Sequence, residues 1–189
     1  MVILIGAESC TGKTLMAQKL LEQYKITYLS TDLIKMGLYR ANANCDFAPN
    51  DSNEVIEECL WPILKAIIEV NIENGQNIII EGCYIFPKRL QEFREEYRKH
   101  IIPVFFGFSS KYIEKNYSSG IIKYNSIIEM RDEEERPQNW FIQANSTWKQ
   151  MCAHNSLKYF EIDDDYLTEM AQIHNWIDGE IYRCKTTHL

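Results

Sequence analysis

The sequence has no long run of basic residues and no long run of apolar residues. Its 20 Lys and Arg are outnumbered by 27 Asp and Glu, which gives a formal charge of −7. Nucleic acids and membrane surfaces attract clustered Lys and Arg, so we expect neither as a general partner. No apolar run reaches the roughly 20 residues that a membrane-spanning helix needs. The segment 1–6 has neither a basic leader nor a cleavage site, so we expect a cytoplasmic protein without a signal peptide.

Closely spaced cysteines and histidine motifs are missing too. The cysteines are Cys10, Cys45, Cys59, Cys83, Cys152 and Cys184, and the histidines are His100, His154, His174 and His188. Zinc sites and compact disulfide frameworks need closer spacing, so we expect reduced thiols and no zinc. Repeats, low-complexity tracts and Pro/Gly/Ser linkers are also lacking, which favours one domain over residues 1–189, with an ordinary apolar content of 46%.

The motif around which the chain is organised is a glycine-bearing loop between an apolar run and a helical pattern. The apolar run is Val2–Ile5, and the helical pattern begins at Leu15. The loop reads Gly6, Ala7, Glu8, Ser9, Cys10, Thr11, Gly12, Lys13 and Thr14. Strand, loop, Gly-Lys-Thr and helix together predict a P-loop, whose backbone N–H groups and helix N-terminus bind phosphate. We expect Lys13 to reach the outer phosphates of ATP and the Thr14 hydroxyl to ligate Mg²⁺.

The spacing of this motif departs from the usual P-loop by one residue. The first glycine normally stands where this chain has Ala7, and Gly6 lies one position earlier. Either Ala7 tolerates the turn or the loop is one residue longer, because alanine adopts a positive φ less readily than glycine. The alternative is a strand, turn and helix in which Gly-Lys-Thr occurs by chance.

Apolar runs alternate with amphipathic stretches along the whole chain, which predicts an α/β fold with a mostly parallel sheet. Strands of such sheets are buried on both faces and read as continuous apolar runs. The further strands are expected at 26–29, 77–80, 101–108 and 159–162, with pairing of the fourth beginning after Pro103 because proline lacks an N–H.

Two acidic residues follow predicted strands, at the sheet edge where α/β proteins bind ligands. Asp32 comes after the second strand and is a candidate for contact with an acceptor substrate, although Ser30, Thr31 or Asp32 could instead cap the helix expected at 33–40. Glu81 comes after the third strand, where a buried carboxylate is costly unless it is paired or near a metal. It is a candidate for the Mg²⁺ site or the acceptor, the alternative being a cap of the next turn.

The middle of the chain predicts one long helix and a charged segment. Asp51 and Glu54 form a capping box before a helix that reaches about residue 74, in which Pro62 should produce a kink or a break. In the segment after Glu81, most charged residues should be solvated. Arg89 is the best placed of them to bind a substrate anion.

Residues 118–138 show no regular pattern and contain a dense run of charges. Such a run is usually solvated, but a phosphoryl-transfer enzyme needs arginines that close over the phosphates. Arg131 and Arg136 are therefore candidates for an active-site role in a lid. Asp163–Asp165 could suggest a metal site, but an acidic cap of the helix expected at 166–182 explains them better.

The P-loop, the Ser-Thr-Asp at 30–32, the Glu-Gly at 81–82 and the arginine segment together resemble the small P-loop kinases. That group includes nucleoside-monophosphate-kinase-like enzymes, shikimate and gluconate kinases, chloramphenicol phosphotransferase and zeta-toxin-like kinases. The resemblance implies a three-layer fold, a five-stranded parallel sheet ordered 2-3-1-4-5, helices on both faces, a lid, and ATP with Mg²⁺ as cofactors. It also implies that Asp32 orients or deprotonates an acceptor hydroxyl, or helps to hold Mg²⁺.

The chain departs from the nucleoside-monophosphate kinases at two places, which favours another small acceptor. It has Glu-Gly-Cys-Tyr after the third strand, and Lys35 where those enzymes tend to have arginine. Acceptor specificity is expected from segment 35–53, including Lys35 and Arg40, together with the loop after Glu81 and the lid. The leading hypothesis is an ATP-dependent small-molecule kinase. The alternatives are a nucleotide-binding regulatory module without kinase activity and a toxin-like kinase acting on a sugar nucleotide.

Overall fold

The computed structural model describes residues 1–41, 45–124 and 136–186. Residues 185 and 186 are described by their backbone alone. Five parallel strands form one sheet in the order β2-β3-β1-β4-β5, which confirms the predicted fold class and strand order. The strands are β1 (Val2–Gly6), β2 (Tyr28–Ser30), β3 (Ile78–Gly82), β4 (Ile101–Phe108) and β5 (Tyr159–Ile162).

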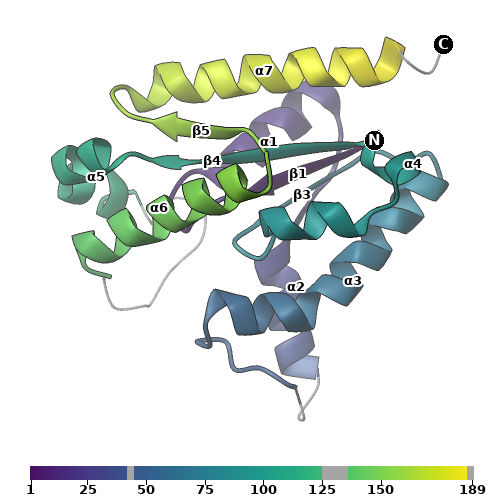
Figure 1. The fold of residues 1–189 in the computed structure, drawn as a ribbon, viewed down its shortest axis with the longest axis horizontal. Coiled ribbons are helices and arrows are strands. Elements are labelled where there is room, and N and C mark those ends of the chain that lie inside the picture. The colour runs from purple at the N-terminus through teal and green to yellow at the C-terminus, as the bar shows by residue number, and fades with distance from the viewer. Residues whose placement is uncertain (42–44, 125–135, 187–189) are drawn as a thin grey trace.

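Helices connect successive strands and cover both faces of the sheet (Figure 1). They are α1 (Lys13–Tyr24), α2 (Thr31–Ala41), α3 (Asn53–Glu73), α4 (Glu95–Arg98), α5 (Ser110–Asn116), α6 (Gln138–His154) and α7 (Tyr166–Thr186), with a 3₁₀ helix η1 (Pro87–Glu92) and a π-helix η2 (Tyr117–Ile122). In Figure 1, α7 runs along one side of the strands and α3 along the other.

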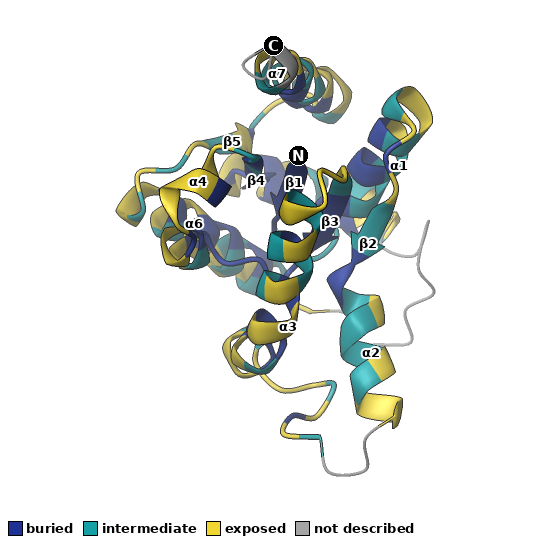
Figure 2. Cartoon of the chain, turned by 90° about the vertical axis from the view of Figure 1, so that its right-hand side faces the viewer, coloured by how far each residue is buried: buried dark blue, intermediate teal, exposed yellow. Residues whose placement is uncertain are grey.

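Alternate residues of β1 enter two separate hydrophobic cores. Ile3 and Ile5 pack with side chains of α1 and α7, whereas Val2 and Leu4 pack with side chains of α3, η1 and α6. This follows from the two-residue period of a strand. Because every residue of β1 is buried, the strand reads as a continuous apolar run. In Figure 2 the central strands are coloured as buried, and exposed residues lie on the helices that surround them.

The start of β4 differs from the prediction. Pairing with β1 begins at Ile101, opposite Val2, and Pro103 lies opposite Leu4 inside the strand. The expectation that pairing starts after Pro103 was therefore wrong. The physical reason is that β5 pairs only with residues from Phe105 onward, so β4 has a single neighbour at Pro103, and a missing N–H on the outer side costs no ladder bond.

The start of α3 also differs from the prediction. Its N-cap is Ser52, whose hydroxyl accepts the Val55 N–H at 3.4 Å, whereas Asp51 accepts the Ala48 N–H at 2.7 Å. The N-cap therefore lies one residue later than expected and is followed three residues on by Val55, so the predicted capping box of Asp51 and Glu54 was wrong. Pro62 does not divide the helix, which runs without interruption over 21 residues.

Two further expectations were tested by the described residues. None of their helices is both long and apolar enough to cross a membrane. All six cysteines carry free thiols, as the spacing predicted.

Candidate functional site

The loop between β1 and α1 resolves the question raised by its spacing. Gly6 is the last residue of β1, and Gly12 is the N-cap of α1 with φ 94°. The positive φ values in the loop belong to Cys10, at 63°, and Gly12. Ala7 is fully buried and has no positive φ, so alanine at the first position of the motif costs no backbone strain.

The two glycines of the motif are required for different reasons. A Cβ on Gly6 would lie 2.6 Å from Cε1 of Phe105 and 2.7 Å from the Ile85 carbonyl, so Gly6 allows the sheet to pack. A Cβ on Gly12 would collide with the hydroxyl of Tyr166, which donates to the Thr11 carbonyl at 3.4 Å. Tyr166, the first residue of α7, therefore contacts the loop although it lies 155 residues away from Thr11 in the sequence.

Lys13 is buried inside the loop and bonded to it. Its Nζ donates to the Glu8 carbonyl at 2.9 Å, and the Thr11 hydroxyl donates to the same oxygen at 2.7 Å. Burial alone would lower the pKa of Lys13, but the acidic groups around it outweigh this effect and the pKa is raised. These groups are Cys83, Glu81, Glu8 and Asp32. The lysine is therefore a charged donor within the loop.

Glu8 was predicted only as one residue of the P-loop, and the structure shows that its carboxylate is buried. The residue is 3% exposed, and its Oε1 accepts the Ser9 N–H at 2.7 Å. Its Oε2 accepts the indole N–H of Trp148 at 3.4 Å. Trp148 lies on α6 and packs against the rings of Phe86 and Phe105, so a contact across 140 residues of sequence completes the loop.

Thr14 and Glu81 meet at the end of the sheet beside the loop. Glu81 lies in β3, is 1% exposed, and accepts a hydrogen bond from the Thr14 hydroxyl at 3.3 Å. Hydroxyl and carboxylate oxygens are ligands that Mg²⁺ accepts, with phosphate and water oxygens completing its shell. Within the described residues no group of three or more His, Cys, Asp or Glu could hold a metal. These two residues therefore fit a cation that is held mainly by a bound phosphate.

Asp32 lies in the first turn of α2 and forms a chain of polar contacts with Lys35 and Tyr84. Lys35 Nζ is 3.1 Å from Asp32 Oδ1 and donates to the Tyr84 hydroxyl at 3.0 Å. The chain therefore joins α2 to the segment after β3, which carries Tyr84. Arg40 is exposed and eight residues further along α2, about 12 Å along the helix axis from Asp32. The structure brings Lys35 to Asp32 but leaves Arg40 at the far end of the helix.

Two buried hydroxyls stand beside this chain without a hydrogen-bond partner among the described residues. They belong to Ser30 and Thr31, which are 3% and 0% exposed. Thr31 packs directly on Gly82, where a Cβ would collide with its hydroxyl. The end of β2 therefore fits closely against the end of β3.

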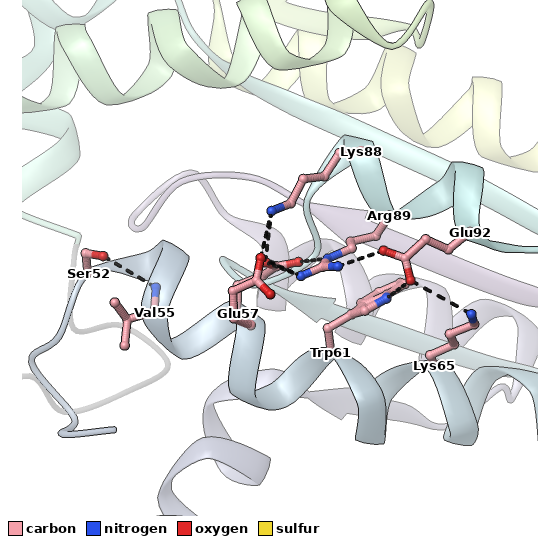
Figure 3. Close-up of polar contacts among 9 residues, drawn as sticks. Ser52, Val55, Glu57, Trp61, Lys65, Lys88, Arg89 and Glu92 are labelled. Carbon is pink, nitrogen blue, oxygen red and sulfur yellow. Dashed lines mark hydrogen bonds and ion pairs between the residues drawn. The ribbon is translucent and has the colours of Figure 1, made fainter. Parts of the chain in front are cut away.

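Arg89 is engaged elsewhere, in a cluster between α3 and η1 (Figure 3). Its guanidinium bonds both oxygens of Glu57, whose side chain is 0% exposed, and donates to Glu92 at 2.7 Å. The hydrogen bonds to Glu57 are the main reason that the pKa of Arg89 is raised. The expected substrate-anion role is replaced by a structural one, because the guanidinium neutralises a buried carboxylate.

The predicted lid falls partly outside the described residues. Arg131 lies outside them, together with the rest of 125–135. The segment before it is π-helix η2 where irregular chain was expected. Arg136 is exposed, its guanidinium lies 4.2 Å from the Trp140 ring centroid, and its carbonyl accepts the Tyr117 hydroxyl at 2.6 Å.

The acidic run before α7 has the capping role that the sequence indicated. Asp165 Oδ2 accepts the Thr168 N–H at 2.8 Å, in the geometry of a helix cap. Asp163 and Asp164 lie 2.9 and 2.6 Å from Lys111 Nζ. Pairing and capping therefore account for all three carboxylates.

No protein-family model matches the sequence, and no curated protein matches it either. The structure, however, is similar to solved kinase structures over nearly its whole length. A gluconokinase from Sinorhizobium meliloti has 12% identity and a TM-score of 0.57, covering 96% of this chain and 95% of that one. A shikimate kinase from Aquifex aeolicus has 12% identity and a TM-score of 0.54, covering 96% and 99%.

A shikimate kinase from Bacteroides thetaiotaomicron has 11% identity and a TM-score of 0.53, covering 94% of this chain and 98% of that one. The chain has the fold of the P-loop kinases. At these identities the likeness concerns only the arrangement of strands and helices. The chemistry of the site has to be inferred from its side chains.

Proposed function

We propose that this protein is an ATP-dependent kinase that requires Mg²⁺ and transfers the γ-phosphoryl group to a hydroxyl group of a small molecule. The observation that carries the proposal is the P-loop with its buried Lys13, flanked at adjacent strand ends by Glu81 and Asp32. A polyphosphate site and two carboxylates at one edge of the sheet are what this reaction needs.

On the nucleotide side, the loop would supply backbone N–H groups and the N-terminus of α1. Lys13 would leave the Glu8 carbonyl, to which it donates at 2.9 Å, and hold the outer phosphates. Thr14 and Glu81 would hold Mg²⁺, which neutralises charge on the transferred group. Positioning of the reactants and neutralisation of the phosphate charge, rather than covalent chemistry by the protein, would account for most of the rate enhancement.

On the acceptor side, Asp32 would receive the proton of the acceptor hydroxyl. The hydroxyl oxygen forms a bond to the γ-phosphorus while the bond from that phosphorus to the bridging oxygen breaks, which releases ADP. Lys35 holds the Asp32 carboxylate at 3.1 Å and would fix its orientation. Arg131 and Arg136 are proposed to close over the phosphates, as the charge that develops there requires.

The acceptor class is proposed to be a small hydroxyl-bearing metabolite. The names of the similar structures, gluconokinase and shikimate kinase, favour this class. The site itself supports it too, because Asp32, Lys35 and Tyr84 offer a carboxylate, an ammonium and a hydroxyl within one short chain of contacts.

The direct test is acceptor-dependent formation of ADP. The protein is incubated with ATP, Mg²⁺ and a panel of sugar acids, hydroxy acids, sugars and nucleosides, and phosphorylated products are identified by mass spectrometry. We expect at least one acceptor to be phosphorylated, and Lys13→Ala to abolish the transfer while the protein remains folded. Transfer at an unchanged rate in Lys13→Ala would contradict the mechanism, and ATP binding without any transfer would contradict the kinase assignment.

A further inference from the structure

A buried negative charge lies within the loop that would bind a polyphosphate. Glu8 is 3% exposed and stands five residues before Lys13. A carboxylate at this place repels the anion that the loop is built to bind, and burial makes such repulsion stronger than in water. Burying a carboxylate without hydrogen bonds would cost free energy. Two hydrogen bonds stabilise the buried carboxylate of Glu8.

These hydrogen bonds prevent the carboxylate from turning away. Oε1 accepts the N–H of Ser9 at 2.7 Å, so one oxygen is held by the loop itself. Oε2 accepts the indole N–H of Trp148 at 3.4 Å. Trp148 is 2% exposed and lies between the rings of Phe86 and Phe105, at centroid distances of 5.6 and 6.2 Å, so its N–H is fixed. The carboxylate is therefore held in place within the loop from two sides.

The charges around the proposed site show what this carboxylate does. Lys13 Nζ lies 2.9 Å from the main-chain carbonyl of Glu8, and the Glu8 carboxylate is one of the groups that raise the pKa of Lys13. Lys35 pairs with Asp32 at 3.1 Å. The fifth charged side chain at the site is Glu81, the proposed metal ligand, whose charge also raises the pKa of Lys13. These five side chains carry one more negative charge than positive charge. A metal-free polyphosphate would meet little net attraction from them, whereas a divalent cation reverses the balance.

We propose that Glu8 makes nucleotide binding conditional on the divalent cation, because its charge offsets that of Lys13 and so rejects metal-free ATP. The inference rests on the proposed function and specifies the ligand of that site as the metal complex of the nucleotide. Glu8 is not a metal ligand in this account. It is a specificity-determining residue that acts through the field at the phosphates.

Isothermal titration calorimetry tests this with ATP in excess Mg²⁺ and with ATP in EDTA. We expect the wild-type protein to bind the Mg²⁺ complex at least about tenfold more tightly than metal-free ATP. Glu8→Gln should strengthen binding of metal-free ATP by roughly fivefold or more, so that the ratio of the two affinities falls. Glu22→Gln, which removes the same charge from the exposed far end of α1, should keep the wild-type ratio.

A bracing role for Glu8 would give a different result. If the carboxylate only held the loop in shape, Glu8→Gln would weaken both forms of ATP alike, and an unchanged ratio would overturn the proposal. Trp148→Phe removes the hydrogen bond but keeps the charge, so it should keep the ratio even if both affinities fall. A ratio that fell in Trp148→Phe as it does in Glu8→Gln would also overturn the proposal.

Two provisions keep the test decisive. Folding of each variant is checked by thermal denaturation, and Glu8→Ser, whose hydroxyl can still accept the Ser9 N–H, replaces a Glu8→Gln that does not fold. Equal affinity of the wild-type protein for both forms of ATP overturns this inference without any variant. Absence of binding in both conditions overturns the proposed function itself, so the two failures are distinguishable.

Discussion

Replacing Arg89 with alanine is expected to lower the free energy of unfolding by about 3 kcal/mol. The change leaves the Glu57 carboxylate, which is 0% exposed, without its two-point partner (Figure 3). Breaking a buried ion pair by removing one member typically costs about 3–5 kcal/mol. The lower end applies here, because Lys88 Nζ remains 3.5 Å from Glu57 Oε2 and is half exposed.

Urea denaturation of the wild-type protein and Arg89→Ala measures this loss directly. For a chain of this size the same loss corresponds to a fall in Tm of roughly 6–12 °C. The matched control is Lys111→Ala, which removes a cation from two exposed carboxylates, Asp163 and Asp164. Exposed pairs contribute little, so the control should lose much less stability than Arg89→Ala.

A second variant separates the buried charge from lost packing. Glu57→Met with Arg89→Met replaces both partners by apolar side chains of similar length and should recover most of the stability that Arg89→Ala loses. If Arg89→Ala lost no more stability than Lys111→Ala, the argument that Glu57 is a buried charge in need of this partner would be refuted.

Three further outcomes are expected. Asp32→Asn should lower kcat by about 10²–10⁴-fold, as loss of a general base does, while calorimetry shows nearly unchanged ATP affinity; an unchanged kcat would remove Asp32 from the chemistry. Gly12→Ala should destabilise the protein by at least about 1–2 kcal/mol through its φ of 94° alone, and Tyr166→Phe should recover only the part due to the collision with the hydroxyl. Burial, and then the hydrogen bond to Asp178, raises the pKa of Tyr24 to about 12. This raised pKa stabilises the fold below about pH 10, and the contribution is lost as the pH rises toward 12. The stability difference between wild type and Tyr24→Phe should therefore shrink in that window, and a constant difference would refute the assignment.

The sheet could be predicted from the sequence because its strands are buried on both faces. The strand Val2–Gly6 contributes side chains to two cores. Because both of its faces are buried, its sequence is an unbroken apolar run. The P-loop was recognisable because its residues are adjacent in sequence. Asp32 and Glu81 were predicted at one edge because parallel strands end there together, and the pairing of Ser30 with Glu81 confirms that placement.

Other features depend on contacts that local sequence does not encode. Pro103 is tolerated because the neighbouring strand starts two residues later, which is a property of the sheet and not of the segment. Arg89 meets Glu57 across 32 residues, and this partner decides its role. Trp148 reaches the P-loop from 140 residues away. A sequence pattern could only have suggested a buried aromatic residue at this position.

The structure of this protein with Mg²⁺ and a non-hydrolysable ATP analogue tests the central claim most directly. The account predicts that the outer phosphates lie within hydrogen-bond distance of the backbone N–H groups of residues 10–14, because the Ser9 N–H is bonded to Glu8. It also predicts that Lys13 Nζ has moved from the Glu8 carbonyl, which lies 2.9 Å away in this structure, to a phosphate oxygen. Phosphates bound elsewhere, or a Lys13 still bonded to Glu8 beside a bound nucleotide, would contradict it.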